Sequence, residues 1–342
     1  MHPGEHTTDS IKLLSRAQSR AARLRHGATG TEHLLFAMLD AGTPTARALA
    51  PGLRDAGRLM GVIASLDPAH WVSEDDETAP PDEEADAIVT AALREAHFST
   101  RKRGPGEPPP PTPALRACLR GASAHAGADP VRPAHLLLGL LDLRGSRAVE
   151  ALRVRRVDRD AVAAAVDPAR EETTEHPSVA LLRRSGVFGG RARLSMRWLS
   201  SGYGSPVLMA VAAEAVRQAV RRGGAEAEPV DLLLGVLSLD RLVERSGERL
   251  PGRAAEVLRA HGVDLPGLLP VVRVPAVPLG KTVALGAEAR RGLTAARLRA
   301  ADGGAEVVGT EDLVVALLDG AVGPLLTGSG HDVAALRAAL TG

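Results

Sequence analysis

The sequence has very few aromatic residues: phenylalanine, tyrosine and tryptophan together make up 2% of its 342 residues. A hydrophobic core must therefore be built from alanine, leucine and valine. Leucine and alanine favour helices, whereas strands favour aromatic and β-branched residues. We expect an all-α protein, with a chain long enough for two or three domains that each bury a core.

Cysteine is equally scarce, since Cys118 stands alone. A single cysteine excludes an intrachain disulfide and a paired-cysteine metal site. Its place in an alanine- and leucine-rich segment favours a buried apolar residue over a nucleophile. No window approaches the roughly 18 apolar residues of a membrane span, and the N-terminal segment lacks the basic and apolar regions of a signal peptide. We therefore expect a cytoplasmic protein with no membrane partner.

The charges nearly cancel, with a formal net charge of +1. A nucleic-acid-binding protein usually carries a basic patch, and base stacking on single strands requires aromatic side chains. The basic cluster 101–103 has no aromatic neighbours of this kind. We therefore expect no nucleic-acid partner.

Motifs of catalysis are also missing. The segment Gly280-Lys281-Thr282 is the only echo of a phosphate-binding loop, but Pro275 stands where that loop requires its first glycine. No G-x-S-x-G nucleophile motif occurs, and the serine, histidine and aspartate of loop 328–332 are neighbours in a single turn rather than members of a triad. We predict no catalytic residue, no metal and no cofactor.

One short stretch is present four times, in progressively altered form. Each copy has a polar or proline-containing start, one histidine or aspartate, and then an apolar run that contains a small residue. The copies are Gly30–Leu39, Arg132–Leu141, Glu228–Leu237 and Gly309–Leu318. Internal repetition of this kind indicates a fold assembled from similar units.

Helical spacing of apolar residues before and after each copy gives four helical repeats, two on each side of an irregular stretch at 167–204 that we interpret as the boundary between domains. The predicted order is a flexible tail at 1–7, a first module at 8–166, a connector at 167–204 and a second module at 205–342. The first module contains repeats 8–66 and 112–166, separated by an acidic and proline-rich linker at 67–111. A helix at about 84–100 is predicted between the acidic and the proline-rich parts of that linker. The second module contains repeats 205–270 and 282–341.

The repeated stretch resembles the N-terminal domain of Clp-family unfoldases such as ClpA and ClpC, which is also called the Clp repeat domain. The mark of that family is a Gly-Thr-Glu-His start followed by a leucine-rich run after a Thr-capped helix. Gly30–Leu39 is similar to it throughout. Gly309–Leu318 is also similar, with Asp312 in place of the histidine, whereas the other two copies keep only the apolar half. The resemblance implies an all-α fold of tandem Clp-repeat modules.

In ClpC-like proteins this domain binds adaptors and substrates, and it can bind phosphorylated arginine at the start of the second helix. The resemblance implies that Thr31 with Glu32, and Thr310 with Glu311, are the ligand-binding residues here. A helix N-terminus favours a phosphate, and a carboxylate matches a guanidinium. A simpler interpretation of the same residues is that they are helix caps and first-turn acids.

His33 and His135 are interpreted as helix residues whose imidazole rings hydrogen-bond to neighbouring backbone, because no second metal ligand lies at a helical spacing. We expect a non-catalytic protein that recognises or sequesters substrates, adaptors or tagged proteins of the Clp protease system, or cyclic peptides that target its unfoldase. Two alternatives stay open. One is a helical scaffold without a small ligand, and the other is a degenerate NTPase or hydrolase that uses Lys281 or the loop 328–332.

Overall fold

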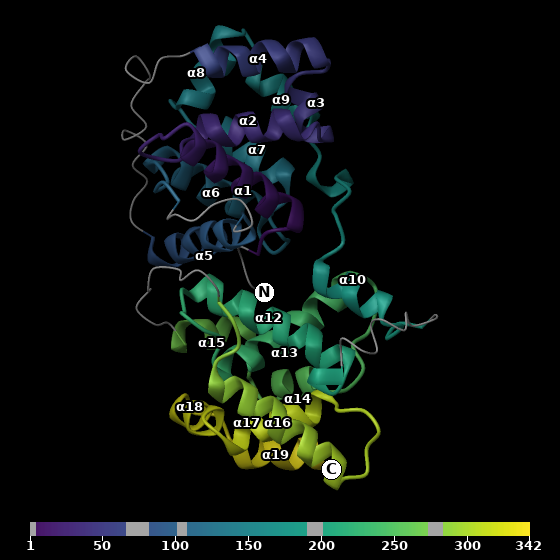
Figure 1. Cartoon of the computed structure of the whole chain (residues 1–342). Helices are drawn as coiled ribbons and strands as arrows, with labels where there is room; N and C mark the ends of the chain where they lie inside the picture. Colours follow the sequence, from purple (N-terminus) through teal and green to yellow (C-terminus); the bar gives the residue numbers. More distant parts are fainter. Residues whose placement is uncertain (1–4, 66–81, 101–107, 190–200, 273–282) are drawn as a thin grey trace. The chain divides into compact units, whose positions relative to one another are not determined.

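A computed structural model describes residues 5–65, 82–100, 108–189, 201–272 and 283–342. Their regular structure is helical and includes no strand, so the predicted all-α class is confirmed (Figure 1). None of the helices described there has the length and apolar character needed to cross a bilayer. The chain divides into two compact units, Met1–Thr174 and Glu175–Gly342.

The first unit contains the helices of the predicted repeats 8–66 and 112–166, with one long helix between them. In chain order they are α1 (Thr8–Arg23), α2 (Thr31–Ala41), α3 (Pro44–Leu49), α4 (Leu53–Ser65), α5 (Glu83–Thr100), α6 (Pro113–Ala126), α7 (Pro133–Leu141), α8 (Arg147–Val154), α9 (Arg159–Ala165) and the 3₁₀ turn η3 (Pro168–Arg170). Four of these described helices, α1, α3, α6 and α8, begin with a hydroxyl cap. Thr7, Thr43 and Thr112 each accept a hydrogen bond from a first-turn N–H.

The core of this unit consists of leucine, alanine, valine and a few other aliphatic side chains, as the composition predicts. Helix α5 contributes Val89, Ala92, Leu93 and Ala96 to it and packs along α1 and α6. The helix expected at about 84–100 is therefore confirmed. The wider description of 67–111 as a linker needs correction, because residues 83–100 are part of the core. Residues 66–81 and 101–107 of that span lie outside the described residues.

The second unit begins earlier than predicted. Helix α10 (Pro177–Arg184) lies inside the predicted connector 167–204, yet it packs against the two following long helices. Ser178 Oγ donates a hydrogen bond of 2.5 Å to the buried Glu214 Oε1. The connector is therefore corrected on both sides: 167–174 belongs to the first unit and α10 to the second.

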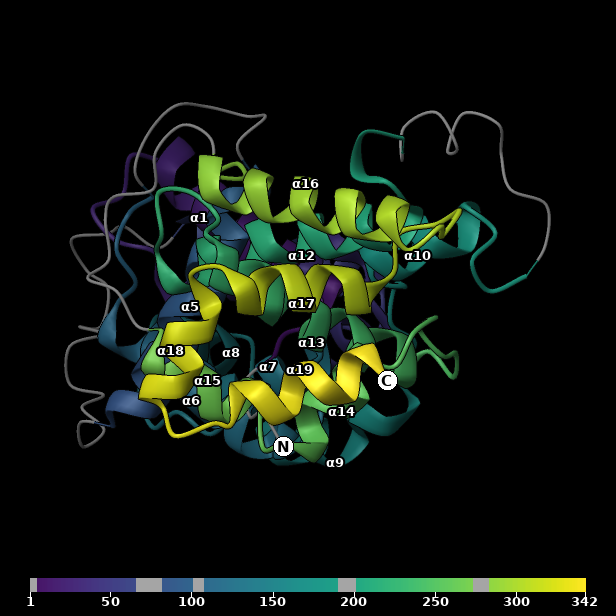
Figure 2. The same cartoon turned by 90° about the horizontal axis from the view of Figure 1, so that it is seen from below.

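The 3₁₀ turn η4 (Ser201–Tyr203) also lies inside the predicted connector. The remaining helices of the second unit follow the predicted repeats, and they are α12 (Pro206–Arg222), α13 (Pro229–Arg245), α14 (Ala254–Ala260), α15 (Leu265–Val271), α16 (Ala287–Asp302), α17 (Thr310–Asp319), α18 (Val322–Gly328) and α19 (Val333–Thr341). Figure 2 shows α16 and α17 side by side, joined at one end by a short loop. Lys281, the lysine of the NTPase alternative, lies outside the described residues.

Short lead-in segments, by which we mean the residues directly before a helix, link the two halves of the first unit. The lead-in of α1 pairs with the lead-in of α7, 124 residues away along the chain. The Thr7 N–H donates to Val131 O at 3.0 Å, and the Val131 N–H donates to Glu5 O at 2.7 Å. The first helix of one half is thereby joined to the second helix of the other.

The reciprocal pairing is present as well. The lead-in of α2 pairs with the lead-in of α6. The Thr112 N–H donates to Thr29 O at 3.0 Å, and the Thr29 N–H donates to Pro110 O at 2.7 Å. Exchanging the two halves of the unit converts the first pattern of hydrogen bonds into the second. The hydrogen bonds between the two halves therefore have pseudo-two-fold symmetry.

The second unit has one of these hydrogen-bonded pairings, and at the position of the other it has a close contact between Gly204 and Val308. The Ala227 N–H before α13 donates to Ala284 O, and the Gly286 N–H before α16 donates to Ala227 O, both at 2.8 Å. At the reciprocal position Gly204 has a φ of +86° and lies against Val308, where a Cβ atom would come within 2.6 Å of a valine methyl carbon. A positive φ and this close approach both favour glycine.

In the second and third apolar runs the small residue is a glycine that lies where two helices approach closely. A Cβ atom at Gly139 of α7 would overlap Cys118 O of α6 and lie 2.6 Å from Ala122 N. At Gly235 of α13 it would lie 2.7 Å from Val211 O of α12. Cys118 is fully buried in this contact, as predicted.

The close approach leads to a prediction for Gly139→Ala. The added methyl group meets backbone atoms, which cannot move aside as a side chain can, so the free energy of unfolding should fall by about 1–3 kcal/mol. Gly57→Ala in α4 is the matched control, because its Cβ would meet nothing within 4 Å. It should be neutral or stabilising by up to about 1 kcal/mol. Urea denaturation followed by circular dichroism distinguishes the two, and an equal effect of both substitutions would contradict the account.

Candidate functional site

The histidine or aspartate of each repeated stretch caps the N-terminus of its helix. The side chain lies in the first turn and accepts a hydrogen bond from the backbone N–H of the N-cap residue, at 2.7–3.0 Å. The four pairs are Gly30 to His33 Nδ1, Arg132 to His135 Nδ1, Glu228 to Asp231 Oδ2, and Gly309 to Asp312 Oδ2. The backbone role predicted for His33 and His135 is therefore confirmed. The interchange of histidine and aspartate follows from a shared need for an acceptor.

Thr31 and Glu32, the first pair of predicted ligand residues, are buried, with exposed fractions of 0% and 1%. The Ala148 N–H at the start of α8 donates to Thr31 Oγ1 at 3.1 Å. Arg147 Nη1 donates to Glu32 Oε1 at 3.1 Å from a side chain that is 24% exposed. An arginine of this chain thus already faces the carboxylate that the resemblance assigns to a ligand guanidinium.

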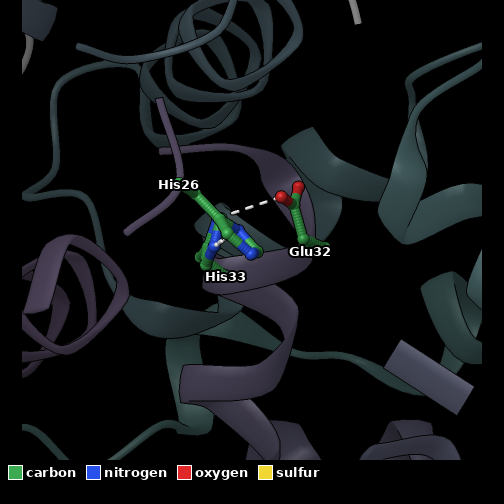
Figure 3. Close-up of side chains that lie close together, drawn as sticks. All are labelled: His26, Glu32 and His33. Atoms are coloured by element: carbon green, nitrogen blue, oxygen red, sulfur yellow. Dashed lines mark hydrogen bonds and ion pairs between the residues drawn. The ribbon is translucent and has the colours of Figure 1, made fainter. Parts of the chain in front are cut away.

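His26 and His33 lie beside this carboxylate (Figure 3). His33 Nδ1 accepts from the Gly30 N–H, so the ring carries its proton on Nε2, which lies 2.9 Å from His26 Nδ1. Burial, followed by the charges of His26, Arg20 and Arg147, lowers the pKa of His33 to about 3. His33 is therefore neutral at pH 7, and its 3.1 Å contact with Glu32 is not an ion pair there.

His26, Glu32 and His33 present ligand atoms within 4.8 Å of one another, a spacing at which a metal ion could be held. The donor atoms are already engaged, however. Both ring nitrogens of His33 have hydrogen-bond partners, and Glu32 is paired with Arg147. A divalent cation would displace the helix cap and lie beside positive guanidinium charge. We therefore assign no metal to this cluster.

Thr310 and Glu311, the second predicted pair, have a different arrangement. Thr310 is buried, and Glu311 is half-buried at the start of α17. The Arg253 N–H, at the start of α14, donates to Glu311 Oε1 at 2.5 Å, and Thr310 Oγ1 lies 3.2 Å from Glu311 Oε2. Here the carboxylate accepts a backbone N–H rather than a guanidinium, and it is closer to solvent than Glu32.

The other two repeats have no acid at the corresponding position, which is occupied by Ala134 in α7 and by Val230 in α13. At α7 the carboxylate of Glu171, from the end of the first unit, accepts the Ala134 N–H at 2.8 Å. At α13 a cavity of about 240 Å³ remains, and its lining includes Val230, Val322 and Glu226. Sequence reasoning missed Glu171 because it lies 37 residues beyond Ala134, whose N–H it accepts.

These four helix starts are therefore equivalent in the backbone and different in their polar contacts. Comparison with models of protein families, with curated proteins and with solved structures gives no match.

The buried histidine predicts a pH dependence of stability. His33 has a pKa of about 3 in the folded protein and the ordinary value of 6.5 when unfolded. The unfolded state therefore binds a proton first as the pH falls, so the free energy of unfolding should decrease below pH 6.5, at most by about 1.4 kcal/mol per pH unit from this site. Urea denaturation at several pH values between 7.5 and 5 measures this slope.

His33→Asn is the control for this prediction. Its amide oxygen keeps an acceptor for the Gly30 N–H and does not titrate. The wild-type protein should lose stability more steeply than the variant as the pH is lowered. Parallel pH profiles for the two proteins would show that His33 does not carry the dependence.

Proposed function

We propose that this chain is a non-catalytic binding protein of the Clp protease system, made of two tandem modules that resemble Clp N-terminal domains. The observation that carries the proposal is the repetition within the first unit. Two halves exchange lead-in hydrogen bonds in a pseudo-two-fold pattern, and each contains the Gly-Thr-Glu-His type of helix start or its remnant. The second unit adds the same cap and one of the two pairings.

The proposed partners are substrates, adaptors or tagged proteins of a Clp unfoldase. The protein either presents them to the unfoldase or competes with the unfoldase's own N-terminal domain for them, or for cyclic peptides that target that domain. Two modules on one chain would raise the avidity for a partner with two tags. The cytoplasm is the compartment that this proposal requires.

Phosphorylated arginine is the specific ligand that the proposal names. At Thr31 and Glu32 such a ligand would have to displace Arg147, since that guanidinium already pairs with the carboxylate. At Thr310 and Glu311 it would replace a single backbone hydrogen bond from Arg253. Because Glu311 is half-buried rather than buried, we place the more accessible site at Thr310–Glu311.

Burial of Thr31 and Glu32 favours the second candidate function, a helical scaffold that binds proteins without a small ligand. In that case these residues serve the junction between α2 and α8. The hydrolase alternative receives no such support. Ser329 Oγ donates to Leu325 O, and Asp332 caps the first turn of α19 through the Ala335 N–H.

Titration of an arginine-phosphorylated model protein into the purified chain tests the proposal. The wild type should bind the phosphorylated form more tightly than the unphosphorylated form, and Glu311→Ala should weaken that preference roughly tenfold, in line with the loss of one charge-assisted contact. Glu256→Ala in α14 is the matched control, because Glu256 is an exposed acid on the neighbouring helix. Arg147→Ala should strengthen binding if Glu32 is a second site.

Degradation of the same substrate by a Clp unfoldase with its peptidase provides the functional measurement. Added chain should change the rate in proportion to its concentration. Equal binding of both substrate forms, together with an altered degradation rate, would support the scaffold. Absence of binding and an unchanged rate at every concentration would contradict both candidates.

A further inference from the structure

The last segment of the first unit, residues 168–174, lies across the starts of three helices. Arg132, at the N-cap of α7, points its Nη1 atom at backbone carbonyls of the segment. It donates to Pro168 O at 2.7 Å, to Glu171 O at 3.2 Å and to Ala169 O at 3.4 Å. A guanidinium has several N–H donors, so it can hold the carbonyl groups of the 3₁₀ turn η3 and of the residue that follows it.

The carboxylate of Glu171 is bound by groups from two different helices. Ala134 N–H in the first turn of α7 donates to Oε2 at 2.8 Å, and the Thr45 hydroxyl of α3 donates to Oε1. A negative group here is favoured by the partial positive charge of the helix N-terminus. In the first repeat the corresponding position carries its own acid, Glu32. The second repeat has Ala134 instead and receives a carboxylate from outside the helix.

A second anchor lies three residues further along. Thr174 donates from its N–H and from its hydroxyl to the two carboxylate oxygens of Asp9 in α1, both at 2.7 Å. Burial acts to raise the pKa of Asp9, but these two hydrogen bonds and the contacts with Lys12 hold it below the ordinary value. The segment is thus held at both ends by polar contacts.

The same segment lies at the surface of its unit. None of the residues 167–174 is buried, and the Arg170 side chain is 89% exposed. The segment contributes no side chain to the hydrophobic core of its unit. The groups that bind it are more enclosed: Ala134 is 2% exposed and Thr45 is 5% exposed. An exposed peptide on an enclosed polar site has the geometry of a bound ligand rather than of a core element.

We propose that Arg132, the Ala134 N–H and the Thr45 hydroxyl form a binding site for a short peptide turn with a glutamate side chain, and that Pro168–Glu171, which contains the 3₁₀ turn η3, occupies this site in cis. A partner that carries such an acidic peptide would bind by displacing the segment. Because the resident segment is part of the same chain, it competes at a high effective concentration, and the free site is exposed only after its release. This inference does not rest on the proposed function.

A labelled synthetic peptide with the sequence of residues 167–174 and blocked ends is the probe. Glu171→Ala in the full-length protein removes the resident carboxylate and leaves the three binding groups in place. This variant should bind the peptide roughly tenfold or more tightly than the wild type, since the internal competitor is weakened. Glu172→Ala, which changes an exposed neighbouring acid, should bind as the wild type does.

Three further measurements keep the test decisive. The same peptide with alanine in place of the glutamate that corresponds to Glu171 should not bind, and Glu171→Ala/Arg132→Ala should lose the gain while circular dichroism shows that its helices are retained. Trypsin should cleave after Arg170 faster in Arg132→Ala than in the wild type, because this substitution weakens the hold on the segment and leaves the cleaved sequence unchanged. Equal peptide binding by wild type and Glu171→Ala, or an unchanged cleavage rate together with no binding, would overturn the proposal. Loss of phosphoarginine binding would bear only on the proposed function, because the probe contains no phosphate.

Discussion

The structure depends on a constraint of the backbone: the N–H groups at and before a buried helix start must find acceptors, since water does not reach them. This chain meets the constraint in two ways. A histidine or aspartate in the first turn accepts a hydrogen bond from the N-cap N–H. A backbone carbonyl in the lead-in of one repeat accepts a hydrogen bond from an N–H in the lead-in of the other repeat. In the first unit neither half satisfies its own lead-ins, so the two halves complete each other. This reciprocal pairing is the reason that we treat the double repeat, rather than the single one, as the folding unit.

The four helix starts share this backbone capping and differ in the side chains that contact them. In the first repeat Glu32 pairs with Arg147. In the second the carboxylate of Glu171 accepts a hydrogen bond from the helix start, and in the fourth Glu311 accepts one from a backbone N–H. The third leaves a cavity beside Val230. The backbone therefore supplies four equivalent positions, and the side chains determine which polar group lies against each of them.

Much of the fold could be predicted from the sequence because its signals are local. Thr7, Thr112 and the other caps precede periodic apolar residues, and the repeated histidine or aspartate has a fixed place in the first turn. The role of α5 was underestimated, because it lies between acidic and proline-rich stretches that are typical of a linker. The candidate site was less accessible to prediction. The partners Glu32 and Arg147 are 115 residues apart, and Glu171 has no local pattern that indicates which helix start it caps.

Native-state hydrogen exchange at the lead-in amides tests the central claim most directly. The Thr29 and Val131 N–H groups belong to short segments outside the helices, yet each donates a 2.7 Å hydrogen bond to the other half of the unit. The account predicts that both amides exchange as slowly as that of Leu35 in the core of α2, because all three become exposed only when the whole unit unfolds. Fast exchange at Thr29 and Val131, with Leu35 still protected, would show that the halves are stable without the pairing and would contradict the account.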